Sequence, residues 1–178
     1  MAGRLLNLKT GIIAVSVLLF IIILVWLFVE SSKPLPGTKT ADEGRGHVPL
    51  GEEVKYVTNP PTSGKHYEDW TRSGVYDSPK DDRNLVHSLE HGYVIMSYKC
   101  SEGSSESSED CKAHHDQLAK IYEQKGKKKL IVLPRPNLDT NFVLTSWDYI
   151  DKFNDFDKGR IEKFIDAHLN QGPEKTME

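Results

Sequence analysis

The sequence has little clustered positive charge. Basic and acidic residues are interleaved along the chain, the formal net charge is −3, and the one basic run is Lys127 to Lys129. A run this short is typical of a solvated turn before a strand, whereas nucleic-acid-binding domains carry a basic face or stripe. We therefore expect no nucleic-acid partner.

Long hydrophobic runs are also scarce. The chain has a single one, Gly11 to Val29. It contains no charged residue, and as a helix it would span roughly 28 Å, close to the hydrocarbon thickness of a bilayer. Arg4 and Lys9 precede the run, and Glu30 follows it. The positive-inside bias predicts a single-pass cell-membrane protein, with residues 1–10 in the cytoplasm, residues 11–29 across the membrane and the remainder outside.

This run also lacks the marks of a removable signal peptide. No small-x-small cleavage site follows it, it is longer than a usual signal-peptide core, and no cysteine near its end offers a point for lipid attachment. We therefore predict an uncleaved signal anchor, with a cleaved signal peptide as the alternative. Residues 30–46 are rich in Pro, Gly, Ser and charge, which predicts a flexible tether before an extracytoplasmic domain at residues 47–174.

Cysteine is nearly absent, since Cys100 and Cys111 are the only two. The residues between them are Ser, Glu, Gly and Asp, which offer nothing to bury. Outside the cytoplasm such a pair is expected to oxidise to a disulfide. The alternative is a thiolate metal site of Cys111 with His114 and His115, but the spacing of these residues fits poorly.

The domain combines strand and helix patterns. Glu53 to Thr58 alternates polar and apolar residues, which predicts a half-buried strand that stops at two prolines. The later segments are expected in the order strand, helix, strand, strand, helix: Tyr93–Tyr98, Cys111–Lys125, Leu130–Leu133, Phe142–Trp147, and a helix capped by Asp157 that ends at Leu169. The fold class predicted is α+β, a small mixed β-sheet with two to three packed helices, preceded by one transmembrane helix.

Candidate metal ligands gather in one segment, where His87 and His91 bracket Glu90 and Gly92 follows. Two local structures fit this segment. If Asn84 caps a short helix, the two histidines lie on one face, about 6 Å apart at Cβ, and can share one metal ion. If the segment is extended, they stand about 13 Å apart and cannot. We favour a helical turn or tight bend, because a glycine supplies the stop that it needs.

A further histidine, His66, lies in a turn-rich loop after two consecutive prolines, and such a loop is suited to aiming one side chain. We predict that His66, His87 and His91 are metal ligands, with Glu90 as the fourth ligand or as a partner of the ligands. Neutral imidazoles suit zinc or copper. The sequence therefore predicts an extracytoplasmic module that binds a transition metal.

Two other functions stay open. In a scaffold or protein-interaction domain, the same histidines would be hydrogen-bonded inside the fold. Alternatively, HSLEH matches the H-x-x-E-H pattern of inverted zinc metallopeptidases, which would make Glu90 the general base of a metal-dependent hydrolase, with Glu162 as a distant ligand. Gly92 leaves little room for the full helix of that fold. Glu174, in the C-terminal tail, is expected to be a solvated charge.

Several motifs resemble those of a bacterial family, the domain of unknown function 3105. They are NPPTSGKHY (Asn59–Tyr67), GVY (Gly74–Tyr76), LVHSLEHGYV (Leu85–Val94), LTSW (Leu144–Trp147) and QGPE (Gln171–Glu174). The resemblance covers about His47 to Glu174 and implies a membrane-anchored or secreted domain, with no activity attached. The histidine motifs of the family fall here on His66, His87 and His91, with Glu90 beside them. Lys65 stands where the family pattern usually has proline.

The topology can be tested with protease. Protease added to intact spheroplasts should digest the domain that follows Val29, because that part of the chain is expected on the outer face of the membrane. Full protection in intact spheroplasts, with digestion only after lysis, would overturn the predicted topology.

Overall fold

The structure, a computed structural model, describes residues 2–100 and 107–176. The chain divides into two compact units, one ending at Leu35 and the other beginning at Pro36. The first unit contains one long helix, α1 (Ala2–Ser31). Of the helices in the described residues, α1 alone is long and apolar enough to cross a membrane, since Gly11–Val29 has a mean hydropathy of 3.3 and is not buried.

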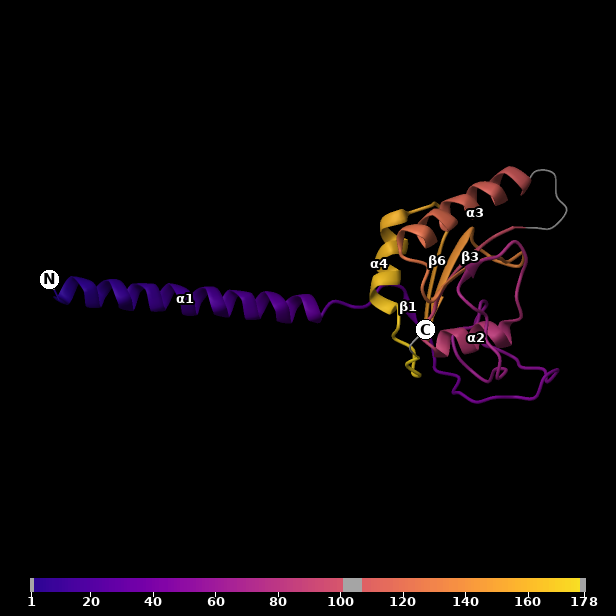
Figure 1. The fold of residues 1–178 in the computed structure, drawn as a ribbon, viewed down its shortest axis with the longest axis horizontal. Coiled ribbons are helices and arrows are strands. Elements are labelled where there is room, and N and C mark those ends of the chain that lie inside the picture. The colour runs from indigo at the N-terminus through magenta and orange to yellow at the C-terminus, as the bar shows by residue number, and fades with distance from the viewer. Residues whose placement is uncertain (1, 101–106, 177–178) are drawn as a thin grey trace. The chain divides into compact units, whose positions relative to one another are not determined.

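The second unit is built on a six-stranded mixed sheet (Figure 1). The strands are β1 (Thr38–Lys39), β2 (Gly74–Val75), β3 (Val94–Tyr98), β4 (Leu130–Pro134), β5 (Phe142–Ser146) and β6 (Tyr149–Phe153), in the order β1-β6-β5-β3-β4-β2. The pairs β2–β4 and β3–β4 are parallel, and the other neighbours are antiparallel. Three helices accompany the sheet: α2 (Asp82–Glu90), α3 (Ser107–Gln124) and α4 (Lys158–His168). The predicted α+β class with a mixed sheet is confirmed.

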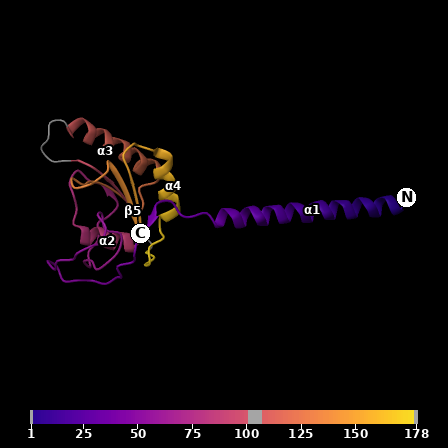
Figure 2. The same ribbon diagram turned by 180° about the vertical axis from the view of Figure 1, so that it is seen from behind.

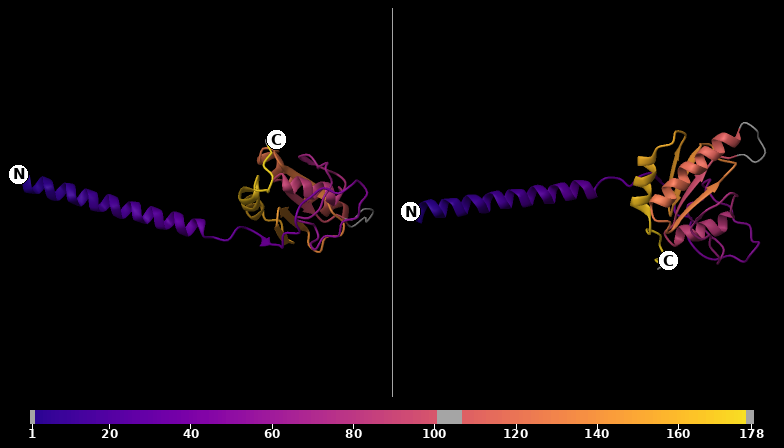
Figure 3. Two further views of the ribbon diagram at one scale, coloured as in Figure 1. Left: turned by 90° about the horizontal axis from the view of Figure 1, so that it is seen from below. Right: turned by 45° about the horizontal axis from the view of Figure 1, so that its top comes forward.

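Helices cover both faces of the sheet, as Figures 1 and 3 show. Successive residues of a strand point to opposite faces, so β3 supplies two separate clusters. Val94, Met96 and Tyr98 pack with residues of α3 and α4, whereas Ile95 packs with α2. Because both faces are buried, the central strands read as continuous apolar runs, which is why the sequence shows them clearly.

Most of the predicted elements are confirmed, with shifted ends. β3, β4 and β5 correspond to the predicted strands, and α4 begins after the predicted cap, where the Arg160 N–H donates to Asp157 Oδ1 at 3.0 Å. The predicted helix at Cys111–Lys125 starts earlier, at Ser107. The Cys100–Cys111 disulfide is also confirmed.

One strand prediction was wrong, and one five-residue strand was not predicted. Glu53–Thr58 forms no strand, although its exposure alternates as expected, with Val54 and Tyr56 half-buried and Val57 exposed. No strand of the described residues pairs with this segment. Conversely, β6 was missed because Asp151 interrupts its apolar pattern. That carboxylate is buried in an ion pair with the Arg160 guanidinium, at 2.6 and 2.8 Å, so it is compatible with a buried strand.

The folded unit begins at Pro36, so most of the predicted tether belongs to the domain. β1 pairs with β6, and the Pro36 carbonyl accepts a 2.8 Å hydrogen bond from Nε2 of the buried His168. Burial lowers the pKa of His168, which keeps the ring neutral. The composition of residues 30–46 does not show that part of this segment is folded. The reason is that β1 is two residues long and is held by backbone hydrogen bonds rather than by its own apolar side chains.

Gly37→Ala tests whether this segment is part of the fold. Gly37 has φ of +84°, and an added Cβ would lie 2.8 Å from Phe164 Cε2 and 3.0 Å from the Ile150 carbonyl oxygen. Gly44 has φ of +82° and nothing within 4 Å of an added Cβ, so Gly44→Ala is the matched control. We expect about 1–2 kcal/mol of destabilisation from the left-handed backbone in each variant, and about 1–3 kcal/mol more for Gly37→Ala from overpacking.

Denaturant unfolding measures both free energies of unfolding. If residues 36–46 were a free tether, neither variant would change the midpoint. Equal losses in the two variants would show that residue 37 does not pack on α4.

Candidate metal centre

α2 carries the histidine motif, and its geometry decides between the two local structures considered above. The helix begins one turn earlier than predicted, with Asp81 rather than Asn84 as N-cap, because the Asp81 carboxylate accepts the Arg83 N–H at 2.9 Å. His91 is the C-cap, and Gly92 follows with φ of +81°. The motif is therefore helical, and the extended alternative is excluded.

Helical spacing brings His87 and His91 together, with their ring centroids 4.4 Å apart. The apolar face of α2 packs Leu85 and Leu89 against the sheet. His87, Glu90 and His91 are buried as well, although they are polar. Burying polar groups costs free energy unless they have partners, so what surrounds them is informative.

The loop that carries His66 is fixed over α2. Ser88 Oγ donates to the Thr71 carbonyl at 2.8 Å and accepts the Thr71 N–H at 3.0 Å. His66 itself is fully buried, and its Nδ1 donates to the Gly64 carbonyl at 2.9 Å. A carbonyl oxygen can only accept, so Nδ1 carries a proton, and in the neutral form of the ring Nε2 is the nitrogen with the lone pair.

His47 joins this group through the backbone. The His66 N–H donates to the Gly46 carbonyl at 3.0 Å, and the Val48 N–H donates to the His66 carbonyl at 2.8 Å. These two bonds form a parallel bridge that sets His47 opposite His66, with ring centroids 5.1 Å apart. His47 is exposed, so it is the solvent-facing member of the group.

We call His47, His66, His87 and Glu90 the inner set. Each offers one ligand atom, and these atoms lie within 4.8 Å of one another. The ring of His87 lies 5.0 Å from that of His47 and 4.8 Å from that of His66, centroid to centroid. His66 Nε2 lies 3.0 Å from Glu90 Oε2. This arrangement has the size of a metal coordination sphere.

A second group, which we call the outer set, consists of His87, His91 and Glu174. Its ligand atoms also lie within 4.8 Å of one another, and His91 Nε2 is 3.6 Å from Glu174 Oε2. Of the residues expected to bind metal, the structure brings His66, His87 and Glu90 into the inner set and places His91 in the outer one. His87 belongs to both sets.

Two members of these sets were not among the expected ligands. His47 had no sequence motif of its own, and its one signal was its position at the start of the family resemblance. Glu174 was expected to be solvated, and its side chain is 55% exposed, but it faces His91. The neighbouring Gly172 and Pro173 were the available signal for a turn back toward the site.

The environment of His87 keeps its ring neutral. Burial lowers its pKa from 6.5 to about 4, and repulsion by His91, His66 and His47 adds to this, against a hydrogen bond with the Tyr67 backbone. Nδ1 of His87 has no hydrogen-bond partner in the described part of the chain. A neutral imidazole with an unpartnered nitrogen is in the state that a metal ligand requires.

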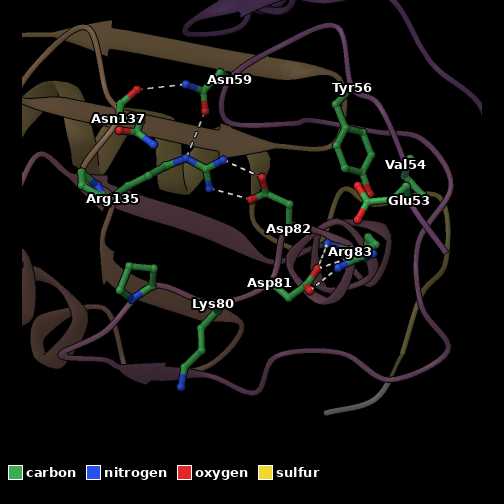
Figure 4. A pocket seen from close by; sticks show the side chains of 12 residues that line it. Glu53, Val54, Tyr56, Asn59, Lys80, Asp81, Asp82, Arg83, Arg135 and Asn137 are labelled. Carbon is green, nitrogen blue, oxygen red and sulfur yellow. Dashed lines mark hydrogen bonds and ion pairs between the residues drawn. The ribbon is translucent and has the colours of Figure 1, made fainter. Parts of the chain in front are cut away.

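A cleft of about 450 Å³ lies beside the N-terminus of α2 and is separate from both sets (Figure 4). Four of its charged groups form two ion pairs. The Arg135 guanidinium binds Asp82 at 2.6 and 2.7 Å and Asn59 at 3.1 Å, while Arg83 pairs with Asp81 at 2.6 Å. These pairs fix the start of α2 against β4 and the loop before His66. No histidine of either set lines this cleft.

Fold and site together define a small α+β domain, preceded by an apolar helix, with a buried histidine–carboxylate cluster. The chain belongs to the family described as "Protein of unknown function (DUF3105)", whose model matches residues 47–178. The resemblance noted in the sequence is thereby confirmed, and all members of both sets fall within the match. No curated protein and no solved structure matches the chain.

The lowered pKa of His87 predicts a pH dependence for the metal-free protein. Its folded-state pKa lies below its unfolded-state value, so the neutral ring contributes stability above pH 6.5, and this stability is lost as the pH falls toward about 4. Denaturant unfolding of chelator-treated protein across this range should show the loss. His87→Gln, which cannot titrate, should have a shallower slope, and parallel curves for the two proteins would contradict the assignment.

Proposed function

We propose that this protein is a membrane-anchored extracytoplasmic domain that binds one zinc or copper ion through the inner set, His47, His66, His87 and Glu90. Two observations support its location. Gly11–Val29 is long and apolar enough for a membrane span, and the disulfide is typical of proteins outside the cytoplasm. The positive-inside bias places the N-terminus in the cytoplasm.

The observation that carries metal binding is the contact between His66 and Glu90. Nε2 and Oε2 are 3.0 Å apart, yet Nε2 makes no hydrogen bond in the described residues, because the two groups are not aligned for one. In the neutral form of the ring both atoms carry lone pairs, and two such atoms this close repel each other unless a cation lies between them. Ligands of one ion show this geometry, since each directs its lone pair at the ion and not at the other ligand.

The donor set indicates which metals fit. Three imidazoles and one carboxylate are nitrogen and oxygen ligands of intermediate softness, which suit zinc or copper better than calcium or magnesium. Met96, a thioether that would favour copper(I), is fully buried in the cluster that faces α3 and α4. It therefore packs on the face of the sheet opposite α2.

Four protein ligands favour binding over hydrolysis. A catalytic zinc keeps one position open for water, with three protein ligands, whereas a closed four-ligand site holds the ion. Glu90 lies with the ligands, 3.0 Å from His66, and is not set apart as a base. We therefore propose storage, delivery or sensing of the ion, or a structural role for it, ahead of hydrolysis.

The experiment measures metal retained by the full-length protein, purified in detergent and offered zinc and copper. We expect one equivalent of metal in the wild type. His47→Ala should weaken binding by about 100-fold or more, beyond the 10–100-fold typical of partners that only orient a ligand. Because His47 is exposed, this variant removes a ligand without opening a cavity in the core.

His115→Ala is the control. His115 lies on α3 and contacts Asp116 at 2.9 Å, remote from the inner set in the sequence and in the fold. It should retain metal as the wild type does. A wild-type protein that retains neither metal would sink the proposal and leave a scaffold domain with structural histidines.

A further inference from the structure

The outer set is built by the C-terminal tail, which the metal site proposed above does not use. After α4 the chain turns back and reaches the end of α2 (Figures 1 and 2). The Asn170 N–H donates to the Gly92 carbonyl at 2.7 Å, and the Glu174 N–H donates to the Glu90 carbonyl at 3.0 Å. The tail therefore attaches through its backbone to the residues that end the histidine helix.

Close packing and a buried lysine hold the tail in place. An added Cβ on Gly172 would lie 2.7 Å from the Leu89 carbonyl oxygen and closer still to backbone atoms of Glu90 and Gly92. The buried Lys129 Nζ donates to three oxygens, at 2.8–2.9 Å: the carbonyls of His91 and Thr176 and the side chain of Asn170. None of these contacts involves the Glu174 carboxylate, which leaves it available to a ligand.

The solvent exposure of the side chains in the outer set decreases from Glu174 to His91 and His87. The Glu174 side chain is 55% exposed and the His91 side chain 6% exposed, and His87 is buried next to the fully buried His66. On the side of His47, by contrast, Arg45 Nε lies 3.9 Å from Glu90 Oε1. An approaching cation meets a carboxylate on the tail side and a guanidinium on the other.

His87 can serve one ion at a time. Its ring hydrogen-bonds to the backbone of Tyr67, and Nδ1 is the nitrogen without a partner in the described chain. One nitrogen with one lone pair cannot bind two ions at once. Since both sets include His87, they represent two alternative positions of a single ion.

We propose that the outer set is an exchange position, through which the ion passes between solvent and the inner set. Glu174 and His91 first hold the ion together with His87. The ion then exchanges them for His47, His66 and Glu90 while it stays bound to His87. This inference rests on the proposed function and specifies the route by which the ion is loaded and released.

The test uses Glu174→Gln in the full-length protein in detergent, with zinc(II) as the probe. Zinc binding and release are followed by stopped flow with a chelating dye, and the Kd comes from equilibrium competition with the same dye. A residue that binds the ion during transfer, but not in the resting site, lowers the free-energy barrier equally for association and for dissociation. We expect association and dissociation each to slow by about tenfold while the Kd changes by less than about twofold.

Glu123→Gln is the matched control. Glu123 lies on α3, its side chain is 57% exposed, close to the 55% of Glu174, and it pairs with Lys127 beyond the end of the helix. It should leave both rates unchanged. Gly172→Ala, which displaces the tail through a backbone clash, should slow exchange at least as much as Glu174→Gln. Wild-type rates in Glu174→Gln or in Gly172→Ala overturn the route.

A weaker Kd in Glu174→Gln with unchanged association also overturns the route, because it would make Glu174 a ligand of the resting site. These outcomes leave the proposed function standing, provided that the wild type binds zinc. If the wild type retains no zinc, the proposed function itself fails and the route fails with it.

Discussion

The free-energy cost of burying imidazole nitrogens is the constraint on which the rest of this domain depends. Three histidines and one glutamate are buried around α2, where water cannot satisfy them. Gly64 satisfies one nitrogen of His66, but His66 Nε2 and His87 Nδ1 have no hydrogen-bond partner in the described residues. Such groups are costly, and one ion bound by several of them removes the cost at once. An ion at the proposed metal site would therefore also stabilise the packing of the segments over α2.

Both ends of the domain contribute to the site. The N-terminal segment brings His47 through a two-bond bridge to His66, and the C-terminal tail brings Glu174 through its backbone bonds to the end of α2. Gly172 allows the tail to approach because any side chain there would meet backbone atoms. The site thus links segments more than a hundred residues apart, so that binding an ion would also stabilise the closure of the domain.

Local patterns in the sequence were sufficient for much of the fold. β3, β4 and β5 are buried on both sides and read as apolar runs, and the i, i+4 spacing of His87 and His91 with a following glycine predicted their shared face. The disulfide followed from two isolated cysteines and the expected compartment. Predictions failed where a segment depends on partners elsewhere. Glu53–Thr58 alternates, but no strand of the described residues pairs with it, and β6 contains an acid that forms an ion pair with Arg160.

By itself, the sequence determined the apolar helix, the α+β class, the pair His87 and His91, and the family. These depend on periodicity, composition and short-range spacing, which are properties of neighbouring residues. Only the tertiary structure decided that His47 lies beside His66, that His91 and Glu174 form a separate set, and that residues 36–46 belong to the domain. Each of these depends on backbone hydrogen bonds and close approaches between distant segments. A peptide group has the same donor and acceptor whatever its side chain, so the sequence gives little sign of such contacts.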